Sequence, residues 1–284
     1  MADVGPAVPT SSDVRAVTVR TADGVDLRGI VVPAALPRPL GGDERPLTFV
    51  LAHGFTNSTA RAPFRRLAHV LAAFGEVRGL DFRGHGRSGG ATGVGGDDEV
   101  LDVDAAVRAA RADGAGTVVT VGLSMGAGVA LRQAAVGEHR PDAVVGVSAV
   151  SRWYVRDTVP MRRVNGMLET GLGRRLGPRV TGIRLGAPWA ELPAAPVQLV
   201  SLIAPTPLLL VHGDRDHYFP LEHVRALARA AGPGTTVWEV PGMGHAESGM
   251  TVPLAERIGR WARETVGRVG LCDDAPVPSD PSHP

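Results

Sequence analysis

The chain of 284 residues is long enough for one large domain built on a central sheet, and its 44% hydrophobic and 21% charged residues are ordinary for a globular protein. A net charge of +1, with no long run of basic residues, excludes the strong field that holds nucleic acid. The single cysteine, Cys272, excludes a disulfide framework and a cysteine-rich metal site.

The first twelve residues lack the basic and apolar stretches of a secretory signal, and no segment reaches the roughly 18 apolar residues of a membrane span. We therefore expect a cytoplasmic protein without membrane or nucleic-acid partners, and the sequence does not specify its oligomeric state. Residues 1–12 and 271–284 are expected to be disordered tails of a single domain that spans residues 13–270.

Two runs rich in β-forming residues, Val14–Thr21 and Val25–Val32, open the domain, and Ala-Asp-Gly between them predicts a hairpin. After a loop rich in Pro and Gly, short apolar segments alternate with longer segments that carry apolar residues at helical spacing. The short segments are predicted strands: Leu47–Ala52, Glu76–Asp81, Thr117–Val121, Ala143–Val147, Pro207–Val211 and Thr235–Val240. The longer ones are predicted helices: Ala60–Phe74, Asp97–Ala112, Met125–Val136, Leu221–Ala231 and Pro253–Val266. This alternation predicts βαβ units, with a mostly parallel sheet and helices on both of its faces.

One interval breaks the alternation. Residues 151–204 separate two predicted strands that a single helix could join, and we expect the excess to form a small cap over the carboxyl edge of the sheet. Its eight arginines against three acidic residues either attract an anionic substrate, such as an acyl thioester, or form a solvated helix face. Trp153, Tyr154 and Trp189 are candidates to line an acyl pocket, although aromatic residues in a cap also hold it onto the core.

The strand predicted at 117–121 runs through Gly122-Leu-Ser124-Met-Gly126 directly into a helical pattern. A Gly-x-Ser-x-Gly sequence between a strand and a helix is typical of a nucleophile elbow, a strained turn that exposes the serine. The glycines leave room for the neighbouring strand and helix, and the dipole of the helix N-terminus favours developing negative charge. We identify Ser124 as the candidate nucleophile.

A nucleophilic serine needs a base, and among nine histidines His245 is best placed, in a Gly-rich loop after the last predicted strand. The base needs a carboxylate to fix its tautomer, and the strand at 207–211 is followed by both Asp214 and Asp216. We assign this role to Asp216, because Asp214 lies in the tight turn itself, where a carboxylate often binds local amides. The reverse assignment remains open.

The oxyanion formed during attack needs two N–H donors, one from the residue after the nucleophile and one from the loop after the third strand. These are Met125 and, in His53-Gly54-Phe55, the backbone N–H of Phe55. His53 is a candidate pocket residue, and its alternative role is to hold the loop by hydrogen bonds.

The segment His212-Gly-Asp214-Arg-Asp216-His217 also has the residue types of a metal site. A dinuclear hydrolytic site needs further histidines at fixed spacing, and His223 and His245 have better explanations on a helix surface and as the catalytic base. We therefore expect no metal and no cofactor.

Four segments together resemble the α/β-hydrolase superfamily. They are His53-Gly54-Phe55, Asp81–Ser88, Gly122–Gly126, and Gly213–Asp216 with Gly244-His245. The resemblance covers residues 47–250 and is strongest to bacterial esterases and to haloperoxidase-like and serine-aminopeptidase-like members with a short cap. It implies the α/β-hydrolase fold, with a mostly parallel central sheet flanked by helices and a small cap insertion, and the order Ser, Asp, His agrees with it. It also implies that Asp81–Ser88 is a structural turn, so Arg83 and His85 receive no catalytic role.

The resulting hypothesis is a serine hydrolase that cleaves a small-molecule carboxylic ester through an acyl-enzyme (class EC 3.1.1). Acyl thioesterase and small-substrate amidase or peptidase activities use the same apparatus and stay open. A different class of explanation is a non-catalytic module of the same fold that binds a ligand under its cap.

Overall fold

Eight strands form one sheet in the computed structural model, which describes residues 14–35 and 46–273. Their order across the sheet is β1-β2-β4-β3-β5-β6-β7-β8. The bounds are β1 Arg15–Arg20, β2 Asp26–Val32, β3 Leu47–Ala52, β4 Glu76–Leu80, β5 Thr117–Leu123, β6 Ala143–Val147, β7 Leu208–Gly213 and β8 Thr236–Val240. Strand β2 pairs antiparallel with β1 and β4, and every pair from β4 to β8 is parallel. The predicted hairpin and the mostly parallel sheet are confirmed.

Burial explains the composition of the central strands. Every residue of β5, β6 and β7 is buried, and these strands consist largely of Val and Leu, as expected for strands covered on both faces. The edge strands β1 and β8 instead alternate between exposed and partly buried residues.

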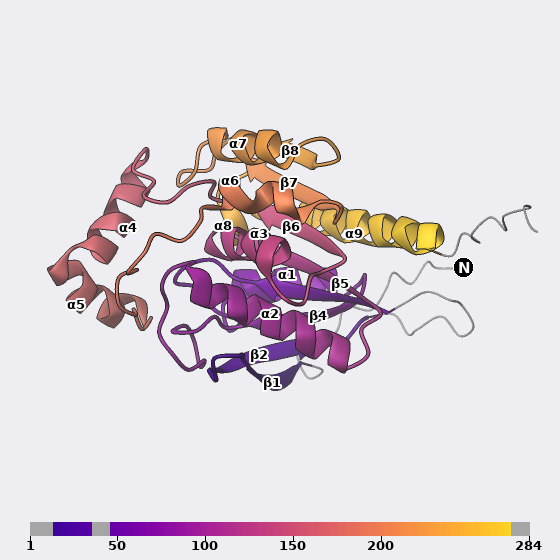
Figure 1. Ribbon diagram of the computed structural model, residues 1–284, viewed down its shortest axis with the longest axis horizontal. Coiled ribbons are helices and arrows are strands. Elements are labelled where there is room, and N and C mark those ends of the chain that lie inside the picture. Colours follow the sequence, from indigo (N-terminus) through magenta and orange to yellow (C-terminus); the bar gives the residue numbers. More distant parts are fainter. Residues whose placement is uncertain (1–13, 36–45, 274–284) are drawn as a thin grey trace, which may run out of the picture.

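Two layers of helices cover the sheet (Figure 1). Their bounds are α1 Ala62–Leu71, α2 Asp97–Ala112, α3 Met125–Val136, α7 Glu222–Ala231, α8 Ala246–Gly249 and α9 Val252–Asp273. Helices α1 and α9 bury Phe64, Leu71 and Ile258 on one face of the sheet. Helices α2, α3 and α7 pack on the opposite face. The predicted α/β-hydrolase fold is therefore present, with helices on both faces.

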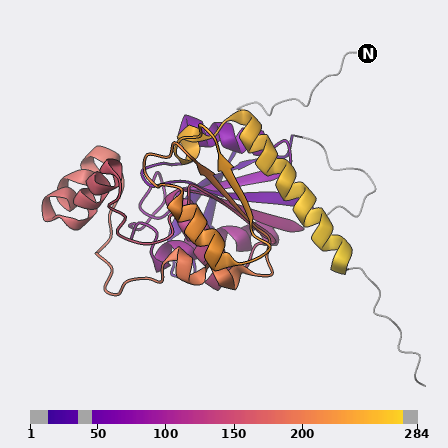
Figure 2. The same cartoon turned by 90° about the horizontal axis from the view of Figure 1, so that it is seen from above.

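The predicted cap interval divides into two parts. Helices α4 (Val159–Glu169) and α5 (Gly171–Thr181) stand clear of the sheet and its flanking helices in both views (Figures 1 and 2). Helix α6 (Pro196–Leu199) and the 3₁₀ helix η2 (Val200–Ile203) instead pack against α3 and α7, with Val200 and Ile203 buried in the core. The protruding part of 151–204 therefore ends before Pro196, because the apolar residues after it complete the helical layer.

The described part of the chain begins at residue 14 and ends with α9 at Asp273. Residues 1–12 and 274–284, which the sequence predicts as disordered tails, lie outside it. Residues 271–273 belong to α9, because no proline interrupts the helix before Pro276. Within the described ranges, no helix has both the length and the apolar character needed to cross a bilayer.

Candidate active site

Ser124 occupies a sharp turn between β5 and α3, with φ of 53° and ψ of −115°. Such a conformation is strained for a residue with a side chain. A Cβ on Gly122 would lie 2.3 Å from the Gly126 carbonyl oxygen, and one on Gly126 would lie 2.4 Å from the Ala52 carbonyl oxygen. The two glycines are therefore needed so that the turn can pack against β3 and the start of α3. The sequence expectation for this turn agrees with its geometry.

His245 and Asp216 meet Ser124 at the carboxyl edge of the sheet. The Nε2 atom of His245 lies 2.8 Å from Oγ of Ser124. On the other side of the ring, Nδ1 lies 2.7 Å from Oδ2 of Asp216. Since the Asp216 carboxylate accepts a hydrogen bond from the Nδ1–H group, Nε2 carries no hydrogen and accepts a hydrogen bond from the hydroxyl of Ser124.

The side chain of Asp216 is inaccessible to solvent, yet it has enough partners to stay ionised. Its Oδ1 atom accepts hydrogen bonds from the backbone N–H groups of Tyr218 (2.8 Å) and Phe219 (3.0 Å). Burial favours the neutral acid, but hydrogen bonding and attraction from His245 outweigh it and hold the Asp216 pKa below its ordinary value. Asp214 is exposed and accepts the N–H of Gly242 at 2.7 Å, which is the local turn role expected for it.

His53 is not a pocket residue, contrary to the sequence expectation. Its ring is fully buried, Nε2 accepts the N–H of Phe82 at 3.1 Å, and Nδ1 donates to the Gly54 carbonyl at 2.8 Å. Burial, the largest effect, lowers the pKa of His53, so the ring is neutral. Nε2 joins the end of β3 to the segment after β4, and Nδ1 holds the adjacent Gly54 carbonyl, so neither nitrogen is left for a substrate. The alternative role considered from the sequence, holding the loop, fits this geometry.

A cavity of about 730 Å³ lies between the carboxyl edge of the sheet and the cap. Ser124, Met125, Phe55 and His245 line it, and so do the three predicted aromatic residues of the cap, Trp153, Tyr154 and Trp189. The volume is in the range of about 300–1,000 Å³ that is usual for small-molecule sites.

The cap aromatics also hold the cap in place. The rings of Trp153 and Trp189 lie 5.2 Å apart, and Nε1 of Trp153 donates to the Pro193 carbonyl at 2.6 Å. Gly96 lets Trp189 approach, because a Cβ there would lie 2.6 Å from the indole nitrogen. Tyr154 is 57% exposed and packs on Trp189 from outside. The two roles considered from the sequence therefore coexist in these side chains.

A family model described as serine aminopeptidase, S33, matches residues 44–185, which is half of the chain. The chain belongs to this family, within the α/β-hydrolase superfamily. The match includes Ser124 and ends before Asp216 and His245. No curated protein matches the chain significantly.

Solved structures give the same fold for this S33-family hydrolase. The esterase Pf2001 from Pyrococcus furiosus is 25% identical, with 91% of this chain and 89% of that chain covered and a TM-score of 0.62. The α/β-hydrolase GrgF from Penicillium sp. sh18 is 19% identical, with 90% and 98% covered and a TM-score of 0.65. XC6422 from Xanthomonas campestris, described as a serine hydrolase without a lid, is 19% identical, with 96% and 99% covered and a TM-score of 0.54.

Two residues close to Ser124, His245 and Asp216 in this hydrolase were not anticipated from the sequence. The ring of Tyr218 lies 4.5 Å from that of His245 and lines the cavity. Glu247 is buried and accepts the N–H of Gly54 at 2.6 Å. The only available signal was their nearness in sequence to Asp216 and His245, which does not fix the direction of a side chain.

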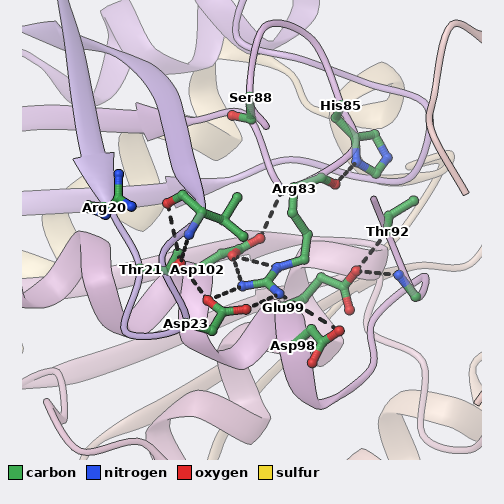
Figure 3. A network of polar contacts seen from close by, with 12 residues as sticks. Arg20, Thr21, Asp23, Arg83, His85, Ser88, Thr92, Asp98, Glu99 and Asp102 are labelled. Carbon is green, nitrogen blue, oxygen red and sulfur yellow. Dashed lines mark hydrogen bonds and ion pairs between the residues drawn. The ribbon is translucent and has the colours of Figure 1, made fainter. Parts of the chain in front are cut away.

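The turn after β4 is held by a buried ion-pair network centred on Arg83 (Figure 3). The guanidinium of Arg83 donates to Asp102 on α2 at 2.8 Å and to Asp23 in the β1–β2 turn at 2.8 Å. Burial opposes the charge of Arg83, but these two carboxylates raise its pKa above the ordinary value. Glu99, one turn before Asp102, accepts the hydroxyl of Thr92 and the N–H of Gly93, two residues of the cavity wall. The network thus ties three segments together and supports one side of the cavity.

The segment 212–217 does not gather its polar groups as a metal site would. Nε2 of His212 is bonded to the Phe219 carbonyl at 2.8 Å and lies 3.7 Å from the Asp216 carboxylate, which is bonded to His245. Asp214 accepts the N–H of Gly242 instead. Among the described residues, the group close enough to hold a metal ion is Asp104, Glu138 and His139, at the opposite end of α3 from Ser124.

Acidification is expected to destabilise the fold from about pH 6.5 downward. Burial lowers the pKa of His223 to about 4 from the ordinary 6.5, and its Nδ1 accepts the N–H of Ser151 at 3.1 Å where the cap begins. Between these pH values the unfolded chain binds a proton that the folded chain excludes, so the free energy of unfolding falls by up to about 1.4 kcal/mol per pH unit for this group.

Urea unfolding at several pH values between 7 and 4 measures this slope. His223→Gln, which cannot titrate, should make the slope less steep by up to about 1.4 kcal/mol per pH unit, whereas His217→Gln on the exposed surface should not change it. An unchanged slope in His223→Gln would show that this imidazole does not set the acid sensitivity.

Proposed function

We propose that the chain is a serine hydrolase that cleaves carboxylic esters (class EC 3.1.1) through an acyl-enzyme on Ser124. The observation that carries this proposal is the continuous hydrogen-bonded series from Asp216 through His245 to Ser124, at 2.7 and 2.8 Å, which ends at the wall of the cavity under the cap. A structural histidine would not require a strained serine at the end of this series.

In the first half of the reaction, Oγ of Ser124 attacks the substrate carbonyl carbon while Nε2 of His245 takes the hydroxyl proton. Asp216 holds the Nδ1 proton and stabilises the imidazolium. The carbonyl oxygen becomes an oxyanion that accepts hydrogen bonds from the N–H groups of Met125 and Phe55. Met125 is the first residue of α3, where a backbone N–H has no acceptor within the helix and the helix dipole favours negative charge.

Collapse of the tetrahedral intermediate breaks the bond to the leaving alcohol, which takes the proton from His245 Nε2. In the second half a water molecule gives its proton to the same nitrogen and attacks the acyl carbon. The acid is released, and Ser124 recovers its hydrogen.

The nature of the cavity supports an acyl substrate. Apolar side chains of the cap, including Val155, Val164, Met167 and Leu168, line it together with Ser124. The esterase named among the similar structures supports an ester, whereas the description of the family supports a peptide or amide bond. Arg163 lines the cavity as well, which keeps an anionic acyl group among the candidates. The absence of nucleic-acid and membrane partners and the cytoplasmic location remain predictions.

Covalent labelling with a fluorophosphonate and a panel of substrates test the proposal together. We expect mass spectrometry to locate the phosphonyl group on Ser124, and labelled protein to lose its activity. The panel contains p-nitrophenyl esters from acetate to decanoate, the matching acyl thioesters and aminoacyl p-nitroanilides, and we expect the highest kcat/KM with the esters.

Each other outcome assigns a different activity. A preference for thioesters or anilides would replace the ester hypothesis by a thioesterase or an amidase of the same mechanism. Absence of labelling and of any turnover would contradict the enzymatic proposal and support a ligand-binding module.

A further inference from the structure

Glu247 is a buried carboxylate that the mechanism above does not use. It lies on α8, two residues after His245, and is only 7% exposed. Its Oε1 atom accepts the backbone N–H of Gly54 at 2.6 Å. A buried charge is costly unless it makes strong hydrogen bonds, and hydrogen bonds between an amide and a carboxylate are roughly twice as strong as neutral ones. The hydrogen bond from the N–H of Gly54 therefore offsets part of the free energy lost when the carboxylate of Glu247 is removed from water.

Glu247 and Ser124 lie on the same side of the Gly54 backbone. A Cβ placed on Gly54 would be 3.2 Å from both carboxylate oxygens of Glu247 and 3.3 Å from Cβ of Ser124. Any side chain at residue 54 would push the carboxylate or the nucleophile away. The close approach of these three groups thus explains why the loop carries glycine here.

Glycine is also the residue with the greatest backbone freedom, so the loop needs restraints on both sides of it. The Gly54 carbonyl accepts hydrogen bonds from Nδ1 of His53 at 2.8 Å and from the N–H of Asn57 at 3.1 Å. That carbonyl and the N–H of Phe55 belong to one planar, trans peptide unit, so fixing the oxygen fixes the opposite direction of the N–H. The carboxylate of Glu247 restrains the preceding N–H and thereby the φ angle of Gly54.

The segment that carries His245 therefore also holds the loop after β3. Ala246, between the two residues, has φ of 41°, and its N–H donates to Oγ of Ser148 at 3.0 Å. This anchors the turn on the end of β6, so His245 and Glu247 are held in a fixed relation to each other.

We propose that Glu247 is a positioning residue that holds Gly54 so that the N–H of the next residue, Phe55, points at the oxyanion. Because Glu247 and His245 belong to one anchored segment, it also fixes this donor relative to the base. The proposal rests on the proposed function, because it assigns Phe55 as one of the two oxyanion donors. It makes Glu247 a determinant of transition-state binding rather than of substrate binding.

Kinetics of three variants test this role. Loss of one oxyanion donor typically lowers turnover by about 10²- to 10³-fold, and a donor that is only misaligned should lose part of that. We expect Glu247→Ala to lower kcat by about 10- to 100-fold with KM changed less than about threefold. Glu247→Gln keeps an oxygen acceptor for Gly54 and should recover most of the lost activity, whereas Glu247→Asp, which is one methylene shorter, should recover little.

A second readout separates positioning from general damage. A trifluoromethyl ketone forms a tetrahedral adduct on Ser124, and its affinity for Glu247→Ala should fall by the same factor as kcat, while binding of a non-reactive alcohol analogue stays unchanged. Glu256→Ala, which removes a half-exposed glutamate from α9, is the matched control and should behave like the natural chain.

The amide proton of Gly54, followed by NMR, reports the bond without any activity and should shift in Glu247→Ala. If Glu247→Ala does not fold, as judged by circular dichroism, Glu247→Gln and Glu247→Asp decide between the alternatives by the same measurements. Equal kcat in Glu247→Asp and the natural chain would overturn the proposal, as would a raised KM with unchanged kcat in Glu247→Ala. A natural chain that turns over no substrate of the panel would instead refute the proposed function itself, and the Gly54 amide would still report whether the contact exists.

Discussion

Ser124→Ala is expected to lower kcat by roughly 10⁴- to 10⁶-fold on the best substrate of the panel, and His245→Ala by a similar factor. The serine supplies the atom that forms the acyl bond, and the imidazole 2.8 Å away supplies the base, so neither group works without the other. The double variant should therefore be no slower than either single variant. Rates are compared under single-turnover conditions at saturating substrate.

Folding must be preserved for this comparison. Thermal unfolding followed by circular dichroism should give Tm values close to that of the natural chain, because Ser124→Ala only removes an oxygen at a site that tolerates a small side chain. If the reduction of kcat in the double variant equalled the product of the two single reductions, the two residues would act independently, which contradicts the proposed mechanism.

The sheet could be predicted from the sequence because burial on both faces leaves a simple signal. Strands β5, β6 and β7 are continuous apolar runs, and the predicted bounds of α2 and α3 coincide with those observed. Strand β5 runs two residues further than predicted, to Leu123, because Gly122 continues the ladder with β6 instead of ending it. Local pattern and tertiary structure agree best for the long elements α2 and α3, which pack on the core over most of their length.

The cap followed no such pattern. Helices α4 and α5 protrude from the molecule (Figure 2), so no sheet imposes an apolar stripe on them. Helix α5 also contains Gly173, Gly177 and Pro178, which are poor helix formers, and leaves Leu172 and Val180 exposed. From the sequence alone its helices were not separable from loop.

Some residues of the candidate site could likewise be predicted from the sequence, and others could not. Ser124, Asp216 and His245, which the structure brings within hydrogen-bonding distance of one another, could be proposed from the sequence because the proposed chemistry requires these residue types at the ends of particular strands. Glu247 was missed, and His53 was named as a pocket residue with loop-holding only as its alternative, because their contacts with Gly54 and Phe82 are not revealed by any spacing in the chain. Residues that hold the loop are specified by long-range packing, whereas residues that react are specified by their chemistry.

Asp216→Asn is expected to lower kcat by roughly 10²- to 10⁴-fold without unfolding the chain. The asparagine oxygen can keep the two bonds from the N–H groups of Tyr218 and Phe219, which leaves its NH₂ group facing Nδ1 of His245. Nδ1 must then accept a hydrogen bond, so the proton moves to Nε2 and that nitrogen can no longer take the proton of Ser124.

The neighbouring Asp214→Asn is the matched control. Its one hydrogen bond, from the N–H of Gly242, can be accepted equally well by an amide oxygen, so kcat should stay within about twofold of the natural value. The natural enzyme should retain an ionised Asp216 into acidic solution, because its pKa is held below the ordinary value. Profiles of kcat/KM against pH for the natural chain and the two variants test this assignment. If Asp214→Asn were inactive and Asp216→Asn active, the residue that orients the base would be Asp214. The bonds from Asp216 to His245 would then be structural.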